Sequence, residues 1–382
     1  MSLKNIKPDQ IKELFARNIP FVDVRAPVEF HQGSLPGAVN MPIMNDEERA
    51  SVGSTYKREG QEAAVKLGHE LVSGAVKEER VEAWKAFFEQ HPQAILYCFR
   101  GGKRSQITQQ WLREAGLSVP LITGGYKAVR SYLMKQIEEF SVRHEMIALS
   151  GPTGSGKTHL LHRLRDQYPV IDLEHLARHR GSAFGAMDLE QPTQIDYENQ
   201  LARELMLLED KIVGGIKPVV EDESRLIGRI YQPATFFIRL RASSVVWIDE
   251  PMHVRVENVF GDYVLQTPIG LSVQSLPRCQ EEEDILRSEA VQVFEKYRRS
   301  VMTIHRKLGG LRCQEVIADL DRAQQDYLNH QELSSNKVWI EKLLSYYYDP
   351  LYLGSLERRQ VNILFKGNLA DAEKYLLELV GK

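Results

Sequence analysis

Short apolar segments alternate with longer amphipathic ones through the first third of the chain. Apolar runs rich in β-branched and aromatic residues predict strands, at 19–23, 94–97 and 119–123. Helical patterns lie between or after these runs, at 61–76, 78–90, 106–115 and 127–140. Strands that alternate with helices are typical of a parallel sheet covered by helices on both faces.

The same alternation starts again after a charged helical stretch that ends near residue 144. Further apolar runs predict strands at 146–150, 169–172, 218–221, 245–248 and 361–365. The pattern from about 281 to 348 is helical and charged, and 368–380 predicts an amphipathic helix. We therefore expect an α/β protein with a parallel-sheet domain at 1–140 and a second α/β domain at 141–382, the latter with a helical insertion at about 281–348.

Length and composition agree with two soluble domains, since 382 residues exceed one ordinary core. The net charge of -3 means that any contact with nucleic acid requires a local basic patch. The three cysteines, Cys98, Cys279 and Cys313, lack metal-ligand spacing, which favours a reducing compartment. No signal peptide and no run of about 20 apolar residues is visible, so we expect a cytoplasmic protein with no membrane partner.

Residues 151–158 read GPTGSGKT, a P-loop between an apolar strand and a helical pattern. Its glycines let backbone N–H groups turn toward a phosphate, and the helix N-terminus favours the anion. Lys157 adds a positive charge, and Thr158 is a candidate ligand of Mg²⁺. The expected phosphate- or diphosphate-binding residues are Gly151, Pro152, Thr153, Gly154, Ser155, Gly156, Lys157 and Thr158.

A P-loop is usually accompanied by a carboxylate at the end of a neighbouring strand, and Glu221 and Asp222 fit this position. Asp172 closes another predicted strand, where small P-loop kinases contact their acceptor. The motif indicates a phosphate or diphosphate site without identifying ATP, because no base-recognition signature accompanies it.

A second distinctive loop, LYCFRGGKRSQ, covers 96–106 and contains Cys98. The six residues after this cysteine include three cations and two glycines: Arg100, Gly101, Gly102, Lys103 and Arg104. Neighbouring cations and a helix N-terminus favour the reactive thiolate form of a cysteine, and glycines let N–H groups face an anion. The loop is therefore expected to bind an oxyanion beside a reactive sulfur.

The Cys-x5-Arg-Ser spacing matches protein tyrosine phosphatases, but the upstream stretch FVDVRAPVEFHQGSLPGAVNMP resembles the rhodanese pattern. Asp23, Arg25, Glu29 and the QGSLPGA turn carry this resemblance, and LITGGYKAV at 121–129 resembles the last strand and turn of a rhodanese domain. The resemblance implies an N-terminal rhodanese-like domain whose cysteine carries sulfur or selenium as a persulfide or perselenide.

A rhodanese-like domain followed by a P-loop NTPase-like domain resembles the tRNA 2-selenouridine synthase family over nearly the whole chain. The segments that carry the resemblance lie at 53–68, 97–105, 151–158, 179–185 (HRGSAFG), 219–228 (VVEDESRLIG) and 346–352. The combination of HRGSAFG and EDESR with the two widespread motifs is specific. One departure is Phe99, where the family commonly has Trp.

This resemblance implies a transferase that replaces the sulfur of 2-thiouridine at the tRNA wobble position with selenium from selenophosphate. It also implies that the enzyme attaches a geranyl group from geranyl diphosphate to that sulfur, so that S-geranyl-2-thiouridine is an intermediate. Selenophosphate and geranyl diphosphate are then substrates, with no tightly bound cofactor. tRNA is the partner, and the selenophosphate-producing enzyme is a candidate partner.

The implied roles divide between the two loops. Cys98 is the selenium-carrying nucleophile or relay, with Arg100 and Arg104 as catalytic partners. The selenophosphate-binding loop consists of Cys98, Phe99, Arg100, Gly101, Gly102, Lys103 and Arg104. The P-loop holds the diphosphate, and Glu221 or Asp222 positions Mg²⁺ or water.

The stretch 294–312, FEKYRRSVMTIHRKLGGLR, is the best candidate for a tRNA-binding patch, and Tyr297 in it is a candidate to stack on a base. A solvated helix face balanced by the acidic run just upstream is an equal alternative. The expected tRNA-binding residues are Arg178, His179, Arg180, Arg225, Lys296, Arg299, Arg306 and Lys307.

Two other functions stay open from the residues alone. One is a P-loop kinase or ATPase with a rhodanese regulatory domain. The other is a non-catalytic sulfur carrier that docks on a partner protein.

Overall fold

The computed structural model describes residues 5–180, 190–273, 280–357, 359 and 361–380. The chain divides into two compact units. Unit 1 comprises Met1–Arg143, Gln191–Lys211 and Ile230–Phe236, and unit 2 comprises His144–Glu190, Ile212–Arg229 and Phe237–Lys382. Two segments that we assigned to the second domain from the sequence therefore pack with unit 1.

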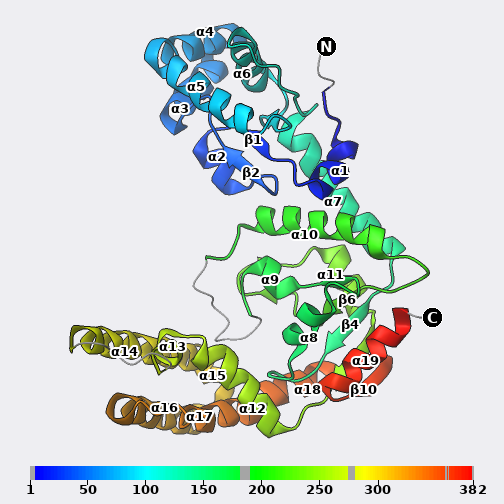
Figure 1. Ribbon diagram of the computed structural model, residues 1–382, viewed down its shortest axis with the longest axis vertical. Coiled ribbons are helices and arrows are strands. Elements are labelled where there is room, and N and C mark those ends of the chain that lie inside the picture. The colour runs from blue at the N-terminus through cyan, green and yellow to red at the C-terminus, as the bar shows by residue number, and fades with distance from the viewer. Residues whose placement is uncertain (1–4, 181–189, 274–279, 358, 360, 381–382) are drawn as a thin grey trace. The chain divides into compact units, whose positions relative to one another are not determined.

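Unit 1 contains a parallel sheet with the order β2-β1-β3. Figure 1 labels β1 and β2 of this sheet. Its strands are β1 (Phe21–Asp23), β2 (Ala38–Asn40) and β3 (Ile95–Tyr97). The strand expected at 119–123 is reduced to two isolated parallel bridges, Leu121 with Leu96 and Ile122 with Ile6. Because β3 ends at Tyr97, Cys98 lies at the carboxyl edge of the sheet, where parallel sheets bind ligands.

Short and long helices surround this sheet: η1 (Pro8–Gln10), α1 (Ile11–Ala16), α2 (Pro27–Gln32), α3 (Asp46–Glu59), α4 (Gln61–Leu71), α5 (Gly74–Gln90), α6 (Lys103–Glu114) and α7 (Gly125–Arg143). The break between α4 and α5 falls earlier than the pattern predicts, at Val72 and Ser73. Helix α3, which the pattern missed, begins with a capping box between Asn45 and Glu48.

Helix α10 (Gln194–Leu208) belongs to unit 1 because its polar residues pair there. The fully buried Asn199 donates to the carbonyl of Ser34 at 2.7 Å and to the hydroxyl of Tyr126 at 3.2 Å. The Asp196 carboxylate accepts from the backbone N–H of Ser34 at 2.8 Å. η2 (Glu209–Lys211) and β8 (Ile230–Tyr231) complete the unit.

A buried ion pair stabilises the carboxyl end of β1. Arg25 Nη2 lies 2.6 Å from Asp23 Oδ2 and donates to the carbonyl of Gly33 at 2.8 Å. The Asp23 and Arg25 side chains are only 0% and 3% exposed. The guanidinium also stacks over the ring of Tyr126, 4.1 Å from its centroid. Removing two charges from water costs desolvation free energy. The ion pair is favourable here because every polar group of Asp23 and Arg25 named above has a partner.

Unit 2 is built on a five-stranded parallel sheet with the order β10-β9-β4-β6-β5. The strands are β4 (Ile147–Ser150), β5 (Val170–Ile171), β6 (Val219–Glu221), β9 (Ser244–Ile248) and β10 (Ile363–Gly367). All five correspond to predicted strands with slightly different ends, which confirms the α/β class of this half. β4 is central and fully buried, as expected for a strand covered on both faces.

The helices and short segments of unit 2 are α8 (Lys157–Leu164), α9 (Leu173–Ala177), β7 (Leu226–Ile227), α11 (Ala234–Arg241, which begins in unit 1), α12 (Met252–Phe260), α13 (Pro268–Val273), α14 (Gln280–Thr303), α15 (His305–Leu308), α16 (Gly310–His330), α17 (Asn336–Leu343), α18 (Asp349–Glu357) and α19 (Leu369–Val380). Two π-helical segments, η3 (Gly261–Leu265) and η4 (Leu344–Tyr348), continue α12 and α17.

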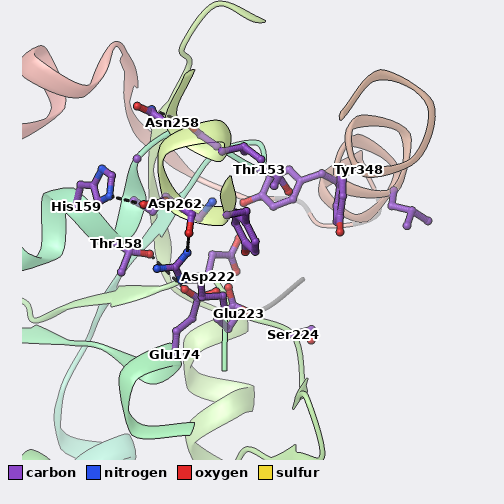
Figure 2. A pocket seen from close by; sticks show the side chains of 18 of the residues that line it. Thr153, Thr158, His159, Glu174, Asp222, Glu223, Ser224, Asn258, Asp262 and Tyr348 are labelled. Atoms are coloured by element: carbon purple, nitrogen blue, oxygen red, sulfur yellow. Dashed lines mark hydrogen bonds and ion pairs between the residues drawn. The ribbon is translucent and has the colours of Figure 1, made fainter. Parts of the chain in front are cut away.

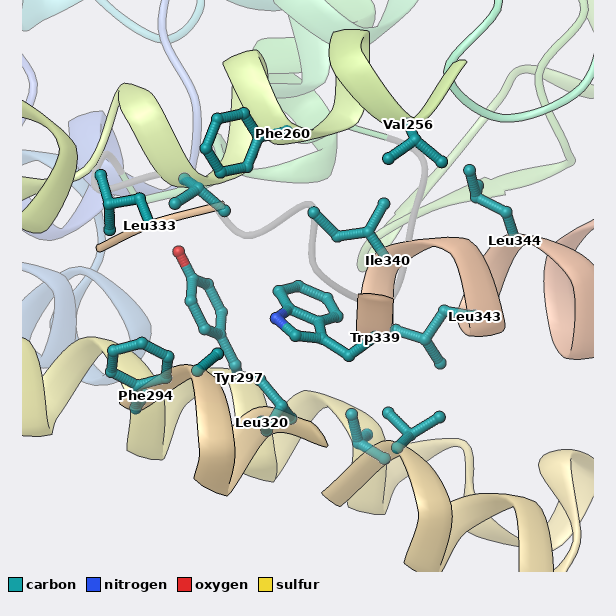
Figure 3. Packing of buried hydrophobic residues seen from close by; sticks show 14 of the residues in the cluster. Val256, Phe260, Phe294, Tyr297, Leu320, Leu333, Trp339, Ile340, Leu343 and Leu344 are labelled. Carbon is teal, nitrogen blue, oxygen red and sulfur yellow. The ribbon is translucent and has the colours of Figure 1, made fainter. Parts of the chain in front are cut away.

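The helical part of unit 2 has its own apolar cluster (Figure 3). Tyr297 from α14 packs beside Trp339 from α17, with ring centroids 5.3 Å apart. Tyr297 is 4% exposed and donates its hydroxyl to the carbonyl of Tyr263 at 2.6 Å. The expectation that Tyr297 stacks on a base is therefore wrong, because the ring is part of the core. Cys313 is also buried here, whereas Cys279 lies outside the described residues.

We predict that Asp23→Asn lowers the free energy of unfolding of the protein by about 3–5 kcal/mol, because it leaves the Arg25 charge buried without a counter-charge. Asp210→Asn, which removes an exposed partner of Lys12, should change it by less than about 1 kcal/mol. Urea unfolding followed by circular dichroism measures both. Equal effects of the two substitutions would contradict the structural role of the buried pair.

Candidate functional site

Cys98 lies in a strand–loop–helix turn of unit 1, directly after β3 and five residues before α6. Its side chain is nearly buried, at 3% exposure, and Sγ lies 3.1 Å from the hydroxyl of Ser105. The first N–H groups of α6 have no carbonyl partner inside the helix, so they are available to an anion at the loop. The structure thus places the predicted cysteine at a helix N-terminus.

The conformation of the Cys98 loop depends on two glycines that meet across it. Gly101 has φ +64° and Gly125 has φ +60°, both in the left-handed region. A Cβ on Gly125 would lie 2.3 Å from the carbonyl oxygen of Cys98 and 2.4 Å from the nitrogen of Gly101. Gly102, by contrast, has open space around its Cα and a negative φ. Close backbone contact between the loop and the start of α7 therefore fixes the loop.

The three cations after Cys98 have different surroundings. Arg104 forms a two-point ion pair with Glu29 of α2, at 2.5 and 3.1 Å. Burial alone would raise the pKa of Glu29, but the hydrogen bonds and charge of Arg104 outweigh it and hold that pKa below the ordinary value of 4.5. Arg100 and Lys103 are exposed, and Phe99 packs near Tyr126. Arg104 therefore anchors the loop, and the exposed pair is accessible to a ligand.

The P-loop of unit 2 follows β4 and leads into α8, as its sequence predicts. Gly154 and Gly156 have φ values of +83° and +84°, and a Cβ on Gly154 would lie 2.6 Å from the carbonyl oxygen of Arg255. Lys157 Nζ donates to the carbonyl of Gly151 at 2.8 Å. The hydroxyl of Tyr352, from α18, accepts from the backbone N–H of Gly151 at 2.9 Å. The loop is thus held in shape by backbone sterics and by a tyrosine distant in sequence.

The carboxylates near the P-loop separate into two groups. Thr158 donates to Glu221 Oε1 at 3.1 Å and to Glu174 Oε2 at 3.3 Å. Asp222 instead pairs with Arg359 at 2.6 Å and accepts from the hydroxyl of Ser150 at 2.6 Å. Of the two carboxylates named from the sequence, Glu221 is the one beside Thr158, and Asp222 holds a structural ion pair.

Burial, followed by the charge of Glu174, raises the pKa of Glu221 well above its usual range. The same two causes raise the pKa of Glu223 to about 8. Buried carboxylates and a hydroxyl supply the hard oxygen ligands that Mg²⁺ prefers, and a cation would relieve their repulsion. The residues present at Thr158 therefore fit Mg²⁺. Among the described residues, no group of three or more His, Cys, Asp or Glu side chains is placed to hold a metal ion, so the fit to Mg²⁺ rests on Thr158 and the two carboxylates beside it.

A cavity of 730 Å³ opens over the P-loop (Figure 2). Glu174, Asp222 and Glu223 line one side of it, and Asp262 and Tyr348 come from the two π-helical segments. Its cationic lining residues are Lys157, Arg180, Arg241, Lys307 and Arg359. π-helical segments are uncommon and are frequent at functional sites. The cavity thus brings cations and aromatic rings together at the P-loop.

The predicted tRNA-binding residues are only partly brought together. Arg180 and Lys307 line the P-loop cavity, although they are far apart in sequence. Lys296, Arg299 and Arg306 are exposed on α14 and α15, outside that lining. Arg178 and Arg225 are exposed, and His179 is partly buried, which lowers its pKa. Residues 181–185 of the HRGSAFG segment lie outside the described residues.

Several residues of both sites were missed from the sequence. Gly125 and Glu29 lie in the segments that resemble a rhodanese domain. Nothing in the sequence indicated that they contact the Cys98 loop. Tyr352 lay in the YYYDPLY segment, which offered a hint, whereas Glu174 and Arg359 lay in no segment of note. These contacts depend on how distant parts of each unit pack.

Fold and loops together define a class of protein in which a rhodanese-like unit with a cysteine loop is joined to a P-loop unit. A family model of the rhodanese-like domain matches residues 7–132, and a model of the tRNA 2-selenouridine synthase AAA domain matches residues 144–381. The chain belongs to the tRNA 2-selenouridine synthase family.

Similar proteins span nearly the full length of this chain. The tRNA 2-selenouridine synthase of Bdellovibrio bacteriovorus is 69% identical over 99% of this chain and 100% of the relative. Those of Nitrosomonas europaea and Sulfurovum sp. (strain NBC37-1) are 56% and 43% identical, each over 96% of this chain and 97% of the relative.

In the part of the chain that the structure describes, no helix is long and apolar enough to cross a membrane.

We predict that Glu29→Gln lowers the free energy of unfolding at pH 7 by about 1 kcal/mol, because it removes the charge that Arg104 stabilises. The pKa of Glu29 is depressed, so this stabilisation is present above pH 4.5 and is lost as the pH falls through the lower folded value. Unfolding curves of both proteins between pH 7 and pH 3 test this. A difference that stays constant over this range would contradict the ion pair as its source.

Proposed function

We propose that the chain replaces the sulfur of 2-thiouridine in tRNA with selenium from selenophosphate, in two steps on two sites. The observation that carries this proposal is the pairing, in one chain, of a P-loop cavity with a separate cysteine loop at a helix N-terminus. Each site suits an anion, yet only one offers a sulfur nucleophile. The named relatives, which match over their full length, support the same reaction class.

In the first step, the P-loop binds the diphosphate of geranyl diphosphate. The sulfur of 2-thiouridine attacks C1 of the geranyl group, the C–O bond breaks, and diphosphate leaves. The uridine loses its N3 proton to solvent, so the product is a neutral S-geranyl base. Lys157 and the N–H groups around Gly154 and Gly156 would stabilise the charge on the leaving diphosphate.

Mg²⁺ held by Thr158 and Glu221 would supply further charge neutralisation to the diphosphate. Tyr347 and Tyr348 line the same cavity as Lys157. Aromatic rings of this kind can stack on an extruded base, which is how proteins commonly read single-stranded RNA. The cavity therefore suits a diphosphate and the wobble base together.

In the second step, the Cys98 thiolate attacks C2 of the S-geranyl base, and the geranyl thiol leaves with a proton. The selenium of selenophosphate then attacks C2 and releases Cys98, and water cleaves the Se–P bond to give phosphate and 2-selenouridine. Selenium stays at the selenide level throughout, so no oxidant is needed. A perselenide on Cys98 formed from selenophosphate would need a two-electron oxidant, which favours the relay role over the carrier role.

Arg100, Lys103 and the first N–H groups of α6 would hold the selenophosphate oxyanion beside this sulfur. The hydroxyl of Ser105, 3.1 Å from Sγ, can donate to the thiolate. Arg104 acts through the shape of the loop, since its guanidinium is committed to Glu29.

The two steps should separate by mutation. Lys157→Ala should reduce S-geranyl formation on 2-thiouridine tRNA by about 100-fold or more, because one charge on the leaving diphosphate is lost. Cys98→Ala should still form S-geranyl-2-thiouridine and accumulate it without selenation. Cys313→Ala, which alters another buried free cysteine, should retain both products. Nucleoside mass spectrometry of the tRNA distinguishes all three.

If Lys157→Ala left geranylation intact, the diphosphate assignment of the P-loop would be wrong. Full selenation by Cys98→Ala would remove the relay role of the cysteine.

The exposed cations of α14 are proposed to contact the tRNA backbone. Lys296→Glu with Arg299→Glu should weaken tRNA binding and lower the slope of log K against log salt by about 2, one per lost phosphate contact. Arg17→Glu with Lys374→Glu makes the same charge change at two other exposed positions, directly after α1 and on α19, and serves as the control. Equal salt slopes for the two double variants would rule out a specific contact on α14.

A further inference from the structure

Unit 1 contains a second cavity, of 440 Å³, beside the Cys98 loop. Its walls come from α3, α4 and α6, and they include Val52, Ala64, Val65 and Ile107. Most of the lining residues are apolar, and α4 also contributes Gln61 and His69. A cavity of this size with apolar walls is typical of a site for a small apolar ligand.

The cavity adjoins the Cys98 loop, although Cys98 itself is not one of its lining residues. Cys98 belongs to the same apolar cluster as Ile43, Val72 and Trp111, which line the cavity, and Val52 and Ile107 pack against that cluster. The Cys98 loop itself supplies lining residues, among them Gly102, whose carbonyl oxygen lies 4.0 Å from Sγ. A ligand in the cavity would therefore have one end at the cysteine loop.

The charges are confined to that same end. Arg100 and Lys103 line the cavity where it meets the loop, and both are exposed. Arg104 also lies there, held by Glu29. The site thus combines apolar walls with a cationic opening. This arrangement suits a ligand whose apolar tail lies in the cavity and whose other end lies near negatively charged groups.

We propose that this cavity binds the geranyl chain of S-geranyl-2-thiouridine in tRNA during the selenium step. The inference rests on the proposed function, which brings a geranylated base, the tRNA phosphates and selenophosphate to the Cys98 loop. With the chain in the cavity, the C2–S bond of the base would lie at the loop, and the cations would face the phosphates and selenophosphate. The free energy of burying the chain is then available to select the geranylated base over the bare thione.

The cavity also gives an order to the two steps. An unmodified 2-thiouridine has no chain to bury, so it would bind the cysteine loop weakly. Selenation would therefore follow geranylation. After C2–S cleavage, the geranyl thiol would be held only by its chain and would leave through the open mouth.

The test uses the full chain, selenophosphate and tRNA anticodon stem-loops that carry S-methyl-, S-geranyl- or S-farnesyl-2-thiouridine. Val65→Phe adds volume inside the cavity, whereas Val76→Phe makes the same change on α5, where Val76 is exposed and lies outside the lining. We expect Val65→Phe to lower kcat/KM for selenation of the S-geranyl substrate by about tenfold or more, as when roughly two methylene groups no longer fit. For the S-methyl substrate, Val65→Phe should change kcat/KM by less than about twofold. Val76→Phe should change kcat/KM by less than about twofold for every substrate.

A second variant protects the test against misfolding. Tyr56→Ala removes a largely exposed ring from the cavity wall and should shift the preference from the S-geranyl toward the longer S-farnesyl substrate. Such a change in chain-length preference would not follow from a general loss of stability.

Three results would overturn the assignment. One is an unchanged chain-length preference in both Val65→Phe and Tyr56→Ala, with wild-type protein active on the S-geranyl substrate. Another is that Val65→Phe lowers kcat/KM equally for substrates of all chain lengths, but only when the selenophosphate-producing enzyme supplies the selenium. That result would make the cavity a protein-docking site. The third is wild-type protein that neither makes nor consumes the S-geranyl base, which would refute the proposed function itself.

Discussion

Backbone N–H groups at the start of an α-helix have no carbonyl partner within that helix, and both candidate sites depend on this constraint. In each unit, a buried parallel strand ends in a glycine-containing turn that leads directly into a helix, β3 into α6 and β4 into α8. Glycines at positive φ let these turns approach neighbouring backbone closely, at Gly101, which meets Gly125 at the start of α7, in one unit and at Gly154 in the other. The chain therefore forms two candidate anion sites by the same physical means.

The two sites differ in what surrounds the anion. Around the P-loop, the cavity is polar, with cations, buried carboxylates of raised pKa and aromatic rings. Around Cys98, the neighbouring cavity is apolar, and cations occur only at the loop. A polar enclosure with a candidate Mg²⁺ position suits departure of a diphosphate, whereas an apolar cavity beside a sulfur suits displacement of an alkyl thiol. This division of chemistry matches a reaction in which one site prepares the base that the other converts.

Both loops could be predicted from the sequence because each is contiguous, with strand, turn and helix in adjacent residues. The strands of unit 2 could be predicted for the same reason. The strand expected at 119–123 failed as a regular strand because only Leu121 and Ile122 find bridging partners. The location of α10 in unit 1 and the burial of Tyr297 depend on packing between distant segments, which periodicity does not reveal. Likewise, the pairing of Asp222 with Arg359 left Glu221 as the carboxylate beside Thr158, a choice that the sequence EDE left open.

The central claim is that the P-loop prepares a geranylated base and the Cys98 loop converts it. The most direct measurement supplies Lys157→Ala with tRNA that already carries S-geranyl-2-thiouridine, together with selenophosphate, and follows 2-selenouridine by mass spectrometry. The account predicts selenation at the wild-type rate, because the step that needs Lys157 has been bypassed. Failure of Lys157→Ala on the geranylated tRNA, by a correctly folded protein, would contradict the separation of the two sites.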